Sequence, residues 1–168
     1  LDVTGRPAAS IANDGEWFYF RSHADQQFHK KKSADASLRR LVSLPVKSSD
    51  ILTLLAGRIP VQDHHTPHLL RDPLGYVLTL KTRWGNVRER IRLDETCTEI
   101  RQIEMFDLFG ELVYRAEFGM MRTVKTYRIP FWLALSDDKG AGFQLRVDRY
   151  WADVPVSAPK FVLDPSGR

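Results

Sequence analysis

The longer, C-terminal part of the chain alternates apolar and polar residues with a period of two, which is typical of strands that bury one face. Segment 76–84, YVLTLKTRW, places its aromatic and aliphatic side chains on one face. Segment 86–94, NVRERIRLD, repeats this pattern, with Glu89 as the exception on its apolar stripe. Gly85 and Asn86 lie between the two stripes and accept positive φ, so these segments predict a β-hairpin.

Further segments with the same period follow, and the turns between them are too short for the helix that a parallel crossover needs. They therefore predict an antiparallel meander. The segments are 99–107, 111–118, 126–136 and 142–151.

The pattern before this region is less regular. Residues 16–20, EWFYF, follow a turn at Asn13–Gly15 and predict a strand, with 26–32 as its hairpin partner. Residues 33–41 form a candidate helix, and 62–73 reads as a loop. The sequence thus predicts a mainly β, α+β fold of about eight strands with two short helices.

One of these helices is predicted within 48–61, SSDILTLLAGRIPV. Ser48, Ser49 and Asp50 can cap its first turn, and Gly57 can adopt the left-handed conformation that ends a helix. A helix over about Asp50–Ala56 is far shorter than the ~20 residues that cross a bilayer. It must therefore cover the apolar face of the meander.

Two roles are open for this helix. Ile51, Leu54 and Leu55 recur at spacings that share one helical face, so burial is expected for a movable lid and for a permanent plug alike. A lid would uncover a cavity mouth, whereas a plug would be part of a filled core.

Composition sets the limits on function. With 168 residues and 43% hydrophobic content, the chain suits one domain with a proper core. Its formal charge is +4, and basic and acidic residues are interspersed along the chain. This mixture argues against a dedicated nucleic-acid binder but is compatible with an anionic membrane surface. The single cysteine, Cys97, excludes an internal disulfide and a cysteine metal knuckle.

Catalytic motifs are missing from the sequence. It contains no Gly-x-Ser-x-Gly elbow, no Cys/His pair, no phosphate-binding glycine loop and no paired carboxylates at a strand end. We therefore expect a protein that is not an enzyme and that needs no cofactor.

The segment DHHTPH is the one candidate metal site. Its imidazoles at His64, His65 and His68, with Asp63, could hold zinc, but Pro67 breaks the helix that would align them. We expect a solvated loop and no metal.

Two basic features each have a structural interpretation and a ligand-binding interpretation. The run 29–32, HKKK, is either a patch for anionic headgroups or a blunted sheet edge. Arg149 falls on the apolar stripe of the last predicted strand, where it either reaches the strand end or contacts a headgroup in a cavity mouth.

Four short motifs occur in order along the chain: NDGEWFYF, SSDILTLLAGRIPV, RIPFWLALS and KFVLDPSGR. Together they resemble the LolA/LolB superfamily of bacterial lipoprotein carriers, and especially its outer-membrane lipoprotein members. The matching positions are Leu54, Leu55, Gly57 and Pro60 in the helix motif, Pro130 at a later strand, and Phe161, Leu163, Pro165 and Gly167 in the tail.

The resemblance implies a curved, unclosed half-barrel whose concave apolar face is covered by short helices and holds acyl chains. Residues 1–168 would be a single LolA/LolB-like domain lacking the N-terminal helix and first strands of the family. It further implies a non-enzymatic carrier of lipids or lipoproteins at the periplasmic face of the Gram-negative outer membrane. Its membrane association would run through an anchor outside this chain, and it would bind no nucleic acid.

A structural or protein-interaction module with a filled cavity is the alternative. The alternating apolar residues suit an ordinary core equally well, and only the resemblance turns them into a cavity wall. The inward stripe also includes Leu93, Tyr114, Ile129, Phe143 and Val147. The residues expected as wall and lid are Ile51, Leu54, Leu55, Leu78, Leu80, Trp84, Ile91, Ile103, Met105, Phe118, Phe131, Leu133, Leu145 and Trp151, with Arg149 as the headgroup contact.

Overall fold

The computed structural model divides the chain into two compact units. The smaller contains a three-stranded sheet, and the larger a seven-stranded sheet with a short helix. The single LolA/LolB-like domain stays a prediction. The structure describes residues 9–23, 25–32, 44–63, 65–157 and 161–163.

The smaller unit is an antiparallel sheet in the order β1-β2-β3. Its strands are β1 (Ala9–Asn13), β2 (Trp17–Ser22) and β3 (Phe28–Lys32), so the predicted strand pair at β2 and β3 is confirmed. The turn at Asn13–Gly15 is also confirmed. Asp14 Oδ1 accepts the Trp17 N–H at 2.6 Å, and this bond lowers the pKa of Asp14. The pattern did not predict β1.

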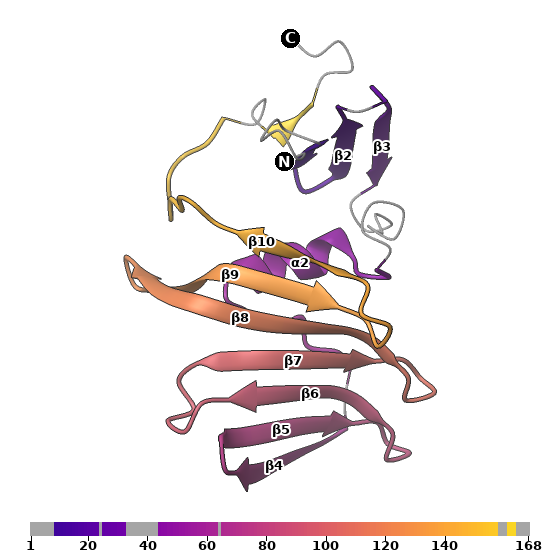
Figure 1. Cartoon of the computed structure of the whole chain (residues 1–168), viewed down its shortest axis with the longest axis vertical. Helices are drawn as coiled ribbons and strands as arrows, with labels where there is room; N and C mark the ends of the chain where they lie inside the picture. The colour runs from indigo at the N-terminus through magenta and orange to yellow at the C-terminus, as the bar shows by residue number, and fades with distance from the viewer. Residues whose placement is uncertain (1–8, 24, 33–43, 64, 158–160, 164–168) are drawn as a thin grey trace. The chain divides into compact units, whose positions relative to one another are not determined.

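The larger unit is a seven-stranded sheet in which every strand pairs antiparallel with its neighbour in the sequence (Figure 1). This confirms the mainly β, antiparallel meander. Among the described strands, the sheet is open between its edge strands β4 and β10. The strands are β4 (Thr66–Asp72), β5 (Gly75–Lys81), β6 (Val87–Leu93), β7 (Ile100–Phe106), β8 (Leu112–Val124), β9 (Tyr127–Ser136) and β10 (Gly142–Arg146).

The prediction of a loop over 62–73 is wrong, because β4 occupies most of it. β4 is an edge strand with both faces largely exposed, so its sequence needs no alternation. Pro67 is tolerated there since an edge strand can leave one side without hydrogen bonds. The predicted helix at 33–41 lies outside the described residues.

The last predicted strand, 142–151, is shorter than expected. β10 ends at Arg146, although the Val147 N–H still donates to the Phe131 carbonyl at 3.0 Å. The alternation of apolar residues continues past Val147, but the pairing with β9 does not. A period of two therefore marks a strand without marking where it stops.

Helix α2 (Ser48–Leu55) confirms the predicted helix. It ends as expected at Gly57, whose φ is 70°, and the Arg58 N–H donates to the Thr53 carbonyl at 3.0 Å, as in a Schellman motif. Figure 1 shows α2 behind β8, β9 and β10. A Cβ on Gly57 would lie 2.4 Å from the Arg128 carbonyl oxygen of β9, so only glycine allows this close approach.

Candidate functional site

The face of the sheet beneath α2 carries most of the core. Registry aligns Leu78, Ile91, Ile103, Ala116 and Leu135 across β5 to β9 in one row. Every member of this row except the half-buried Leu78 is buried. The meander thus presents one continuous apolar surface to the helix, as the alternation predicted.

Most of the expected wall and lid residues lie in this core. The buried ones are Ile51, Leu54, Leu80, Ile91, Ile103, Met105, Phe118, Phe131 and Leu133. Leu55, Leu78 and Leu145 are half-buried. The other residues of the expected stripe follow the same pattern: Tyr114 and Ile129 are buried, and Leu93, Phe143 and Val147 are half-buried.

Three of the expected site residues do not lie on the apolar face. Trp84 is 83% exposed in the turn between β5 and β6, and Trp151 is 70% exposed beyond the end of β10. Arg149 is likewise exposed beyond β10, so it does not interrupt a buried stripe. For each of these residues, the prediction continued the alternating pattern beyond the last residue of the strand that pairs in the sheet.

A polar cluster lies within the helix-covered face. Glu89 is fully buried opposite Leu80 in β5, and the neighbouring Tyr114 is buried as well. The Tyr114 hydroxyl donates to Oδ2 of Asp50 in α2 at 3.4 Å. Burial raises the pKa of Tyr114 far above its usual value, and the negative charges of Asp50 and Glu89 raise it further. The phenol is therefore a fixed, neutral donor between the sheet and the helix.

A β-bulge explains how the segment after the helix joins this cluster. The register of β5 and β6 shifts beside Leu80, so that Arg88 and Glu89 both lie near the same position of β5. Both reach Gln62: its N–H donates to Glu89 Oε2 at 3.3 Å, and Arg88 Nη2 donates to its Oε1 at 2.6 Å. Glu89 was noticed in the sequence only as an exception, and nothing there indicated these partners.

The opposite face of the sheet carries a different arrangement. Glu104 is buried there between two arginines, with 2.8 Å from Oε2 to Arg90 Nη1 and 2.8 Å from Oε1 to Arg115 Nη2. Arg92 pairs with Asp72 at 2.9 Å. Two of the three arginines that alternate along β6, Arg90 and Arg92, are thus held in ion pairs.

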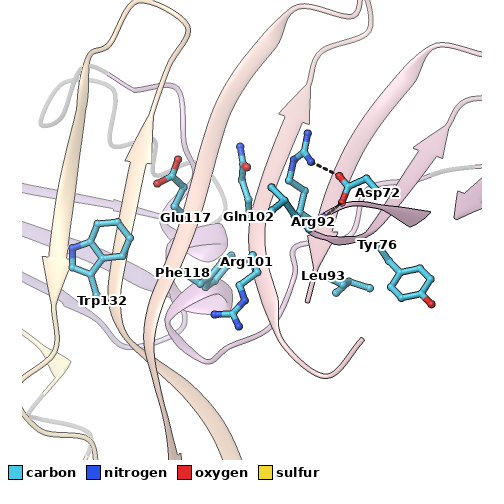
Figure 2. Close-up of a pocket in the computed structure, with 10 residues that line it drawn as sticks. Asp72, Tyr76, Arg92, Leu93, Arg101, Gln102, Glu117, Phe118 and Trp132 are labelled. Atoms are coloured by element: carbon cyan, nitrogen blue, oxygen red, sulfur yellow. Dashed lines mark hydrogen bonds and ion pairs between the residues drawn. The ribbon is translucent and has the colours of Figure 1, made fainter. Parts of the chain in front are cut away.

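A shallow pocket of about 280 Å³ opens near these ion pairs (Figure 2). The Trp132 ring lies against Gly119, where a Cβ would come within 2.8 Å of the indole Cε3. Glu117 and Gln102 pair across β7 and β8 beside it. The pocket lies just below the ~300–1,000 Å³ of typical small-molecule sites. A glycine within a strand was the one sequence signal for this close packing.

The remaining sequence candidates are the histidines around the start of β4 and the basic run in β3. His65 and His68 are exposed, His64 lies outside the described residues, and the described part of the chain contains no group of three candidate metal ligands. In HKKK, the Lys30 ammonium lies 4.3 Å from the centre of the Trp17 ring. β3 is an edge strand of its sheet, which is the position where lysines can oppose pairing with a further strand.

Comparisons with known proteins leave the family open. No family model, no curated protein and no solved structure matches this chain. Within the described residues, no helix has the length and apolar character needed to cross a bilayer. The LolA/LolB resemblance therefore stays a prediction.

Proposed function

We propose that this chain is a non-enzymatic acyl-chain binder or carrier of the LolA/LolB type, working at the periplasmic face of the outer membrane. The sheet would act as an unclosed half-barrel, and the ligand would be a lipid or the acyl chains of a lipoprotein. The observation that carries the proposal is α2, a short apolar helix lying on the apolar face of an open antiparallel sheet.

The free energies of apolar burial favour replacement of the helix by an acyl chain. α2 contributes two buried apolar side chains, Ile51 and Leu54, worth about 1.5–3 kcal/mol each. An acyl chain of about fourteen carbons offers roughly 11 kcal/mol before ordering costs, at about 0.8 kcal/mol per methylene. A helix of eight residues has little stability of its own to oppose this exchange.

The two ends of the helix differ in how they are held. At Gly57 the backbone packs directly against the Arg128 carbonyl of β9, which suits a fixed end. At the other end Ser48 and Ile51 are buried, and the Tyr114 hydroxyl donates to Asp50 Oδ2 at 3.4 Å. A lid that turns about Gly57 would therefore have to release this buried end.

A second candidate function is a structural or protein-interaction module with a filled core. It is favoured by the complete burial of Ile103 in β7 and Leu133 in β9. In that case α2 is a plug, and its removal would cost as much as other core changes, about 2–5 kcal/mol per truncated leucine.

Uptake of a fluorescent fatty-acyl probe separates the two functions. The wild-type chain should bind the probe, and Leu54→Ser should lose that binding while the sheet stays folded. Leu52→Ser is the matched control, because Leu52 is 52% exposed on the same helix and should not affect uptake. A wild-type protein that never takes up the probe, with a melting temperature sharply lowered by Leu54→Ser alone, would contradict the proposal.

A further inference from the structure

Three hairpin turns of the seven-stranded sheet share one construction. In each, the side-chain oxygen of the first residue accepts the backbone N–H groups of the third and fifth residues, at 2.8–3.2 Å. The first N–H also donates to the fifth carbonyl, and a glycine with φ of 82° to 86° occupies the fourth position. The turns are Thr82–Asn86, Asp107–Glu111 and Asp137–Ala141.

These three turns lie on the same side of the sheet, at the ends of its strands. They join β5 to β6, β7 to β8 and β9 to β10, and in a meander such alternate connections fall on the same side (Figure 1). Asn86 Nδ2 donates to the Leu108 carbonyl at 3.4 Å, so the first two turns touch. Neighbouring hairpins are spaced by two strands, or ~10 Å.

The first two turns carry large apolar side chains that the fold does not bury. Trp84 is 83% exposed, Leu108 68% and Phe109 89%. Trp84 and Phe109 occupy the same third position of equivalent turns, and Lys139 occupies it in the third turn. Single exposed apolar residues are ordinary, but three on two touching turns form a patch that needs a partner.

We propose that these three residues, Trp84, Leu108 and Phe109, form an apolar tip that inserts into the interfacial region of a phospholipid bilayer. Indole and phenyl rings favour that region, where an apolar body meets a polar boundary. All three side chains lie on turns at the ends of strands, where they are largely exposed.

Hydrogen bonding within the turns supports a membrane partner. A backbone that leaves water must satisfy its polar groups internally. The Asp107 side chain and backbone satisfy the N–H groups of Phe109, Gly110 and Glu111, and Thr82 does the same for its own turn. These donors are already bonded within the turns, so they lose no hydrogen bonds to water when the tip moves from water into the interface.

Charge around the tip decides which lipids it should prefer. Arg83 and Lys139 lie beside Glu111 and Asp138, all of them exposed, so the edge carries both signs. Attraction to anionic headgroups is then weak, and apolar insertion supplies most of the affinity. The inference is independent of an acyl-binding cavity, since the tip lies on turns away from α2.

Vesicle binding of the full chain tests the inference. We expect co-sedimentation with phosphatidylcholine vesicles, with little change when phosphatidylglycerol or salt is added. Trp84→Ser with Phe109→Ser should weaken binding by about tenfold or more. Leu74→Ser is the matched control, because Leu74 is 80% exposed in the β4–β5 turn, at the opposite end of the strands. This substitution should leave vesicle binding unchanged.

A polarity-sensitive fluorophore can locate the contact. Placed at Leu108→Cys in a Cys97→Ser background, it should shift to the blue with vesicles, whereas the same label on native Cys97, exposed in the β6–β7 turn, should not. Several results would overturn the inference: no vesicle binding, equal responses of both labels, or binding that needs anionic lipid and disappears in salt. Unchanged vesicle binding of the double variant would also overturn the inference, because the contact with the bilayer would then lie elsewhere.

Discussion

The two faces of the seven-stranded sheet each bury a glutamate, and they do so in different ways. On one face Glu104 lies between Arg90 and Arg115, so its charge is balanced by short ion pairs. On the other, Glu89 lies under α2 with the Gln62 N–H and near Tyr114. The first arrangement is built entirely from strands and is rigid. The second joins strands to a helix and the segment after it, so it can change if the helix moves.

The largest expected difference concerns the apolar residues of the helix-covered face. Leu133→Ala, at a fully buried position of β9, should lower the free energy of unfolding by about 2–5 kcal/mol. Leu54→Ala in α2 should cost about half as much, because a short helix can detach while the sheet stays folded. Urea unfolding of both variants measures this, and equal losses would mean that α2 is a plug.

The ion pairs of the other face should give the next largest effect. Glu104→Gln leaves Arg90 and Arg115 without their common carboxylate. Both arginine side chains are more than a third exposed, so water offsets part of the loss, and we expect about 1–3 kcal/mol rather than the ~3–5 kcal/mol of a fully buried pair. Urea unfolding should show this decrease at neutral pH, and no change would mean that the network adds no stability.

The same substitution on the helix-covered face should have a smaller effect. Glu89→Gln keeps an oxygen for the Gln62 N–H, so the unfolding free energy should change by about 1 kcal/mol or less. Burial and the Asp50 charge remain in this variant, so Tyr114 stays a neutral donor to Asp50. Urea unfolding at neutral pH measures the change in stability. A loss as large as that of Glu104→Gln would remove the distinction between the faces.

A turn carboxylate that belongs to neither face should give the smallest effect. Asp94 accepts hydrogen bonds from the Thr96 hydroxyl and the Glu99 N–H, which lower its pKa from 3.8 to about 2. Its stabilising effect is present above its unfolded pKa and is lost as the pH falls through about 2. Asp94→Asn should therefore lower stability slightly at neutral pH, leave it unchanged near pH 2 and flatten acid unfolding between these values, as pH-dependent circular dichroism can show.

Sequence alone predicted those elements whose burial leaves a local pattern. β5 to β9 bury one face each and alternate clearly, and α2 has both a capping start and a terminating Gly57. β4 escaped because an edge strand with two exposed faces has no alternation to detect. Trp84 and Trp151 were misplaced because alternation continued beyond the last paired residue.

The polar contacts could not be predicted, since they depend on register. Arg88 and Glu89 reach Gln62 together only because a bulge beside Leu80 shifts the pairing of β5 and β6. The choice of Glu104 as the partner of Arg115 follows from the pairing of β7 with β8. Neither the bulge nor the register leaves a recognisable mark in these residues. The acyl-binding role stays a prediction for the same reason, because no pattern distinguishes a cavity wall from a core.

Native mass spectrometry of the protein, purified gently from a bacterial envelope and then mixed with acyl lipids, tests the central proposal most directly. An acyl binder should appear with added mass equal to one lipid, retained by wild type and Leu52→Ser and lost in Leu54→Ser. The bare polypeptide mass in every sample, from protein shown to be folded by circular dichroism, would contradict acyl binding and leave the filled scaffold.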